Sequence, residues 1–164
     1  MRCLNTAKMR DLDLPIITSI LPSNEMQISR GLQLIVERGH TRVGILVFSF
    51  KAGPDDLRES ALIEVIERLI GKGYDLRIYD QNVNIASLVG ANRDFILNRI
   101  PHISQLMVHE IDAALNHAQT VVIGTNDPEF NKVPERLQEG QFLIDFVRIT
   151  GKVSKNGNYD GICW

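Results

Sequence analysis

Residues that attract anions gather in the segment 49-SFKAGPDD-56 and in Arg58, which follows it. Lys51 is a cation next to two chain breakers, Gly53 and Pro54. A lysine ammonium and the free amides at the N-terminus of a helix both attract phosphate and other anions. The segment is therefore predicted to form an anion site if it joins a strand to a helix.

A simpler interpretation of these charges is an ordinary protein surface. Lysine is mostly exposed in any protein, and Arg58 can form a surface ion pair with Asp55 or Asp56. Against this, a cation in the first turn of a helix opposes the helix dipole and gains no stability there. Both interpretations stay open on these residues alone.

The elements around the segment favour a strand-to-helix turn. The continuous apolar run 42-RVGILVFSF-50 is typical of a strand buried on both faces. Asp56 and Glu59 have the spacing of a capping box and begin an amphipathic stripe that stops at 71-GKG-73. A second strand, 75-DLRIYD-80, closes a parallel strand–helix–strand unit.

The same alternation continues along the chain. Helices are predicted at 24–39 and 111–118 and after Asp127-Pro128, strands at 103–108, 120–125 and 141–147, and a loop or tail at 150–161. Two prolines bracket 14-LPIITSILP-22 and are expected to limit any helix there. The pattern predicts an α/β fold, a Rossmann-like, doubly wound domain with a mostly parallel sheet preceded by a helix. Such domains bind ligands beyond the carboxyl ends of their strands.

Composition excludes several classes of partner. With 18 Lys and Arg against 20 Asp and Glu, the net charge of −2 favours neither nucleic acid nor an anionic membrane. No apolar run approaches the roughly 20 residues that span a bilayer. Cys3 and Cys163 form no closely spaced pair, which favours reduced thiols and a cytoplasmic protein.

Other common sites are not indicated. Neither a triple-glycine dinucleotide fingerprint nor a P-loop occurs, so the chain alone carries no complete dinucleotide site. Asp80 has the place of a ribose-binding aspartate, but without the glycines it is interpreted as a turn former. Metal binding is not expected, because the four histidines are scattered over different predicted elements: His40, His102, His109 and His117.

Several strings together resemble one enzyme family. The string 49-SFKAGPDDLRES-60 is similar to the opening of the C-terminal domain of nucleotide-sugar dehydrogenases that act on UDP-glucose or GDP-mannose. Four further strings resemble the GDP-mannose branch of the family: 70-IGKGYDLRIYDQNV-83, 90-GANRDFILNRIPHI-103, 122-VIGTNDPEF-130 and 161-GICW-164. Asp145-Phe146-Val147 stands where the UDP-glucose branch has Asp-Gly-Arg, which favours guanosine over uridine.

The resemblance implies an NAD-dependent oxidoreductase that converts GDP-mannose to GDP-mannuronate, of which this chain is the nucleotide-sugar-binding part. Residues 1–40 are then a connector and the end of a linking, dimerising helix, and 41–164 the binding domain. NAD is held mainly by an N-terminal domain that the chain lacks. The family's nucleophilic cysteine, in a Gly-Gly-Ser-Cys context, also lies upstream of this domain, and no such context occurs here. No catalytic residue is assigned here, and the chain alone is expected to be inactive.

By the same resemblance, Phe50 and Lys51 bind the nucleotide sugar and Arg58 reaches NAD. Two departures bear on this: Val47 stands in place of glycine and Pro54 in place of threonine. They leave open a domain whose ligand loop has decayed. A free-standing module that binds a nucleotide or modulates a partner is a further alternative.

Self-association is expected as well. Ile28, Leu32 and Ile35 form an apolar stripe that is predicted to be exposed if further helices are missing, and an uncovered apolar patch tends to find a partner.

Overall fold

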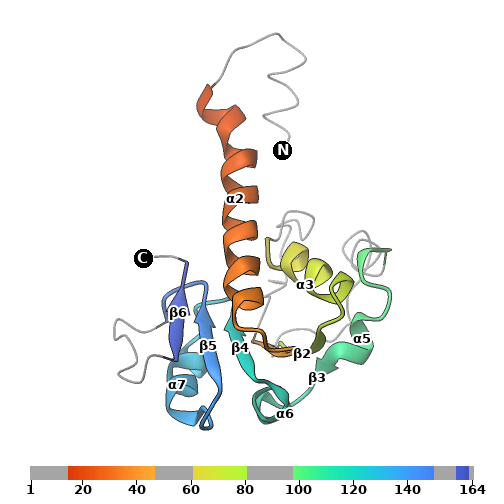
Figure 1. Ribbon diagram of the computed structural model, residues 1–164, viewed down its shortest axis with the longest axis vertical. Coiled ribbons are helices and arrows are strands. Elements are labelled where there is room, and N and C mark those ends of the chain that lie inside the picture. The colour runs from red at the N-terminus through yellow and green to blue at the C-terminus, as the bar shows by residue number, and fades with distance from the viewer. Residues whose placement is uncertain (1–14, 47–60, 81–97, 150–157, 163–164) are drawn as a thin grey trace.

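The computed structural model describes residues 15–46, 61–80, 98–149 and 158–162. They form one six-stranded sheet in the order β3-β2-β1-β4-β5-β6, and all five pairings are parallel (Figure 1). The strands are β1 Arg42–Leu46, β2 Asp75–Tyr79, β3 Met107–Val108, β4 Thr120–Ile123, β5 Phe142–Asp145 and β6 Tyr159–Gly161. This strand order is that of a doubly wound Rossmann-type sheet, which confirms the predicted fold class.

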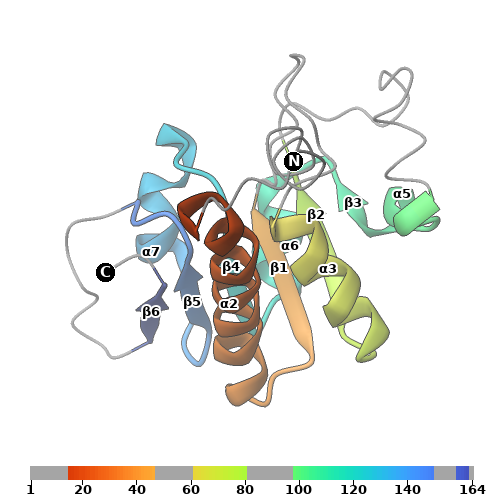
Figure 2. The same ribbon diagram turned by 90° about the horizontal axis from the view of Figure 1, so that it is seen from above.

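Helices cover both faces of the sheet (Figure 2). They are α2 Pro15–Glu37, α3 Ala61–Gly71, α5 Ile103–Leu106, α6 Ile111–His117, the 3₁₀ helix η3 Pro128–Lys132 and α7 Val133–Arg136. One core cluster joins α2 and α3 to the sheet, and a second joins α6, η3 and α7 to its other face. Val121 and Val122, neighbours in β4, enter opposite clusters because successive strand residues point to opposite faces.

Helix α2 differs from its prediction at the N-terminal end. It begins at Pro15 and continues through Pro22, so the expectation that the two prolines limit a helix was wrong. Proline at the first position of a helix is compatible with helical geometry, and an interior proline has a local cost of about 3 kcal/mol that a longer helix can tolerate. The predicted helix at 24–39 is the C-terminal part of this 23-residue element.

The apolar stripe of α2 was predicted to be exposed, but it packs within the chain. Ile35 is fully buried, and Ile28 and Leu32 are half-buried against the core that contains α3. Val36 is exposed near the C-terminal end of α2. Four more exposed apolar side chains lie in the N-terminal half of the helix, whose end stands clear of the sheet in Figure 1: Ile16, Ile20, Leu21 and Met26.

Polar contacts attach the rest of α2 to the domain. Glu25 accepts a hydrogen bond from Arg68 of α3 at 2.7 Å. Arg38, just after the helix, binds Asp160 of β6 at 3.0 Å, and its guanidinium lies 3.9 Å from the centre of the Phe142 ring. The division into units 1–40 and 41–164 stays a prediction.

Two other predictions need correction. The run at 103–108 was predicted as a strand, but it forms the short helix α5 followed by the two-residue strand β3. The predicted loop or tail at 150–161 contains strand β6 at its end. Three residues that include Asp160 and Gly161 carry little strand signal, and their pairing with β5 is what makes them a strand.

Candidate functional site

The strand order places one switch point between β1 and β4. From β1 the chain proceeds towards β2 and β3, and from β4 towards β5 and β6, on the opposite side. Loops therefore leave the carboxyl ends of these two neighbours in opposite directions, which is where doubly wound domains bind ligands. The two ends are fixed to each other, since the Gly124 amide donates to the Leu46 carbonyl at 3.1 Å.

The loop predicted to bind the ligand begins at this point. Strand β1 ends at Leu46 and helix α3 is described from Ala61, so the segment between them leads from a strand to a helix, as predicted. Phe50, Lys51 and Arg58 lie in it, outside the residues that the structure describes, together with Val47 and Pro54. Their roles stay predictions.

The segment after β4 is the part of the switch point that the structure describes. The Asp127 amide donates to the Thr125 carbonyl at 3.1 Å, and the Asp127 carboxylate accepts the Glu129 amide at 2.9 Å. Asp127 is therefore the N-cap of η3, with Pro128 directly after it, which confirms the start predicted from Asp127-Pro128. These bonds hold Thr125 and Asn126 in one tight turn.

A second residue pair fixes the same segment to β2. The Tyr79 hydroxyl donates to the Glu129 carboxylate at 3.1 Å, and the Tyr79 ring meets Phe130 edge-on with 6.4 Å between centroids. Burial, and then the hydrogen bond to Glu129 and its negative charge, raise the pKa of Tyr79 to about 12. No local pattern in the sequence predicts this pair, because its residues are 50 positions apart.

Asp145 at the end of β5 organises the next loop. Its buried carboxylate accepts the amides of Val147, Arg148 and Ile149 at 2.7 to 2.9 Å and the Tyr159 hydroxyl at 2.6 Å. Arg148 is in the left-handed region with φ 57°, which these bonds support. Asp145 is 1% exposed and its carboxylate is engaged, so its role is to shape the loop.

The other titratable candidates lie elsewhere. Asp80, interpreted from the sequence as a turn former, is 6% exposed, and its role in a turn stays a prediction because residues 81–97 lie outside the described part of the chain. His40 bonds Thr120 at 2.8 Å and His117 bonds the Asp75 carbonyl at 3.1 Å, both at the amino ends of strands. Across the described ranges, no three His, Cys, Asp or Glu side chains are grouped to hold a metal ion.

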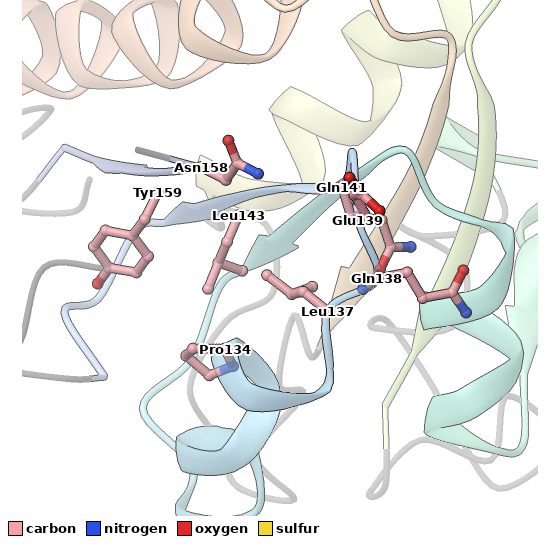
Figure 3. Close-up of a pocket in the computed structure, with 8 residues that line it drawn as sticks. All are labelled: Pro134, Leu137, Gln138, Glu139, Gln141, Leu143, Asn158 and Tyr159. Atoms are coloured by element: carbon pink, nitrogen blue, oxygen red, sulfur yellow. Dashed lines mark hydrogen bonds between the residues drawn. The ribbon is translucent and has the colours of Figure 1, made fainter. Parts of the chain in front are cut away.

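A cavity of about 420 Å³ lies away from the switch point, between α7 and the β5–β6 edge (Figure 3). Its lining includes Leu137, Leu143 and several polar side chains. Two of the polar lining groups are engaged within the protein: Gln141 donates to the carbonyls of Leu115 and Ala118, and Tyr159 donates to Asp145. These bonds give both side chains a structural role, and no chemistry is assigned to the cavity.

Comparison with known proteins shows the family of the chain. Residues 44–152 match the family model described as the UDP-glucose/GDP-mannose dehydrogenase family, UDP binding domain. This chain belongs to that family. It carries the C-terminal, UDP-binding domain, as the resemblance implied, and the matched range begins in β1 and contains the loop after it.

Characterised relatives cover nearly the whole chain. GDP-mannose 6-dehydrogenase of Pseudomonas syringae pv. tomato is 39% identical over 155 residues, which are 94% of this chain and 35% of the relative. The enzyme of that name from Pseudomonas putida is 41% identical over the same shares. The chain thus spans about a third of the length of the relatives it matches.

Solved structures agree. GDP-mannose dehydrogenase from Pseudomonas aeruginosa, solved as a ternary complex, has a TM-score of 0.83 at 38% identity and covers 98% of this chain and 37% of its own. A UDP-glucose dehydrogenase from Pyrobaculum islandicum has a TM-score of 0.68 at 24% identity, which supports the fold alone. Among the described residues, no helix has the length and hydropathy to cross a membrane.

Proposed function

We propose that this chain is the nucleotide-sugar-binding domain of an NAD-dependent dehydrogenase that oxidises GDP-mannose to GDP-mannuronate, and that GDP-mannose binds at the carboxyl ends of β1 and β4. The observation that carries the proposal is the position of the loop with the family's string, residues 49–60, directly after β1 at the switch point. Relatives named for GDP-mannose match 94% or more of the chain.

Within this site we assign the diphosphate to Lys51, with Phe50 beside it. A lysine ammonium supplies the charge-assisted contact that a diphosphate favours. Arg58 is assigned to NAD, seven positions further along. One loop would then serve two ligands at the boundary between two domains.

The described residues do not fit a dinucleotide cradle of their own. After β4 the chain enters a 3₁₀ helix of five residues, whereas a dinucleotide site needs a glycine-rich turn and the N-terminus of a full helix. NAD, which accepts a hydride when bound, is therefore assigned to protein outside these 164 residues, with Arg58 as the contact from this domain.

Calorimetric titration of the purified chain with GDP-mannose and, separately, UDP-glucose tests the proposal. Saturable binding of GDP-mannose that is tighter than binding of UDP-glucose is expected. No binding of either sugar nucleotide would reject it and favour a domain whose ligand loop has decayed. UDP-glucose as the tighter ligand would reject the guanosine assignment only.

We also propose that the chain self-associates through the N-terminal part of α2. The support is the group of exposed apolar side chains there, of which Ile16 is 83% and Met26 72% exposed. Sedimentation at micromolar concentration should give a mass above that of one chain, and Met26→Glu should reduce it. A single-chain mass for the wild type contradicts the proposal.

A further inference from the structure

The turn after β4, residues 124–127, has no role in the proposed function, which assigns ligand contacts only to the segment after β1. It follows β4 at the switch point, and the bond from Gly124 to Leu46 holds its start against the end of β1. Asn126 is exposed and Thr125 half-buried, whereas the strand residues before them are buried. Two side chains with hydrogen-bonding groups are thus presented to solvent where a ligand is expected.

The backbone of this turn is fixed from three directions. Gly124 is bound to β1, Asp127 caps η3, and Glu129 accepts the Tyr79 hydroxyl of β2. Binding residues that a rigid scaffold holds in place lose little conformational freedom when a ligand arrives. The structure therefore presents Asn126 in a fixed position, as a ligand contact requires.

The charge of the turn indicates which part of the ligand the turn can contact. Between Gly124 and Phe130 there are two carboxylates, Asp127 and Glu129, and no cation. Glu110 adds a third negative charge near the Tyr79 hydroxyl. A diphosphate is repelled by such a surface, whereas neutral hydroxyl groups are not.

We propose that Asn126, supported by Thr125, binds hydroxyl groups of the nucleotide sugar and not its diphosphate. An asparagine amide both donates and accepts, which suits a pair of sugar hydroxyls. The inference rests on the proposed function and adds a specificity-determining residue at the carboxyl end of β4. The hydroxyls belong either to the ribose or to the hexose.

Titration with GDP and with GDP-mannose tests the contact in Asn126→Ala. The variant should bind GDP-mannose roughly three- to tenfold more weakly, the loss of one or two neutral hydrogen bonds. Asn126→Asp should weaken binding further, because it adds another carboxylate beside a dianionic ligand. A loss for both ligands identifies the ribose, and a loss for GDP-mannose alone identifies the hexose.

Asn131→Ala is the matched control, since Asn131 is also an exposed asparagine but lies in η3, outside the turn. It should bind both ligands as the wild type does. Wild-type affinity in both Asn126 variants, or an equal loss in Asn131→Ala, overturns the inference while the proposed function stands. No binding by the wild type rejects the proposed function and this inference with it.

Discussion

Gly44 of β1 and Ala114 of α6 approach so closely that a Cβ on Gly44 would lie 2.8 Å from the Ala114 carbonyl oxygen and 3.0 Å from the Ala118 Cβ. Backbone cannot move aside as a long side chain can. Gly44→Ala should therefore lower the free energy of unfolding by about 1–3 kcal/mol, the usual cost of overpacking a core. Denaturant unfolding measures this change.

Gly71→Ala is the control for that substitution, because a Cβ built on Gly71 meets no heavy atom within 4 Å beyond its chain neighbours and the backbone of its own helix. Gly71 ends α3, where alanine favours the helix by up to about 1 kcal/mol. The free energy of unfolding of Gly71→Ala should equal that of the wild type or be slightly higher. Equal destabilisation by both substitutions would contradict the close packing of β1 on α6.

Replacing Glu129 should lower the pKa of Tyr79. In Glu129→Gln the buried phenol keeps its desolvation but loses the neighbouring negative charge, so its pKa should fall from about 12 towards the ordinary 10.0. An absorbance titration of the phenolate, with Tyr79→Phe to assign the signal, measures the shift. An unchanged pKa in Glu129→Gln argues against the contact.

The raised pKa of Tyr79 also gives a sign for stability at high pH. Because the folded state favours the neutral phenol, the stability that this group contributes is complete below pH 10.0 and is lost as pH rises to about 12. The stability difference between wild type and Tyr79→Phe should therefore shrink across that window. A constant difference would contradict the shift.

Glu64 should make the stability of the protein depend on pH in the acidic range. Hydrogen bonds from Arg99 and then Arg68, each at 3.1 Å, lower the pKa of the Glu64 carboxyl below 4.5, although burial opposes them. Its stabilisation is present above pH 4.5 and is lost as pH falls through the lowered pKa. Because the side chain is 33% exposed, Glu64→Gln should cost only about 0.5–1 kcal/mol at neutral pH.

Glu135→Gln serves as the control, since Glu135 is an exposed glutamate on α7. It should leave stability nearly unchanged at neutral pH. The loss of stability in Glu64→Gln, measured by chemical denaturation, should disappear in acid, where the Glu64 carboxyl of the wild type is protonated. A loss that is independent of pH would mean that packing, not charge, is responsible.

Lys51 and Arg58 should separate in binding experiments. Lys51→Ala should weaken GDP-mannose binding roughly ten- to a hundredfold, because a charge-assisted contact contributes about 1.5–3 kcal/mol. Arg58→Ala should leave it nearly unchanged, since its proposed partner is NAD. Calorimetry of both variants is the measurement, and equal losses would refute this division of roles.

The chain alone should not reduce NAD with GDP-mannose or UDP-glucose. Its sequence contains neither the glycine fingerprint that holds a dinucleotide nor a Gly-Gly-Ser-Cys string. Absorbance of NADH over time at high protein concentration is the measurement. Steady NADH production that repeats in independently purified preparations would contradict the assignment of NAD and the nucleophile to other protein.

Sequence alone was sufficient for the alternating architecture and for a segment that leads from a strand to a helix between β1 and α3. The run at 42–50 contains the whole of β1, and Asp127-Pro128 marks the start of η3, because burial on both faces and capping leave local signals. The strings shared with the family pointed to the domain that the comparison then showed.

Tertiary structure decided what depends on partners distant in the chain. Strand β6 exists through its pairing with β5, and the stripe of Ile28 and Leu32 is covered because α3 packs beside it. The Tyr79–Glu129 contact, and with it the fixed turn that presents Asn126, joins segments 50 residues apart. No periodicity or capping rule encodes such contacts, since they arise only when the strand order brings the ends of β1, β2 and β4 to one edge of the sheet.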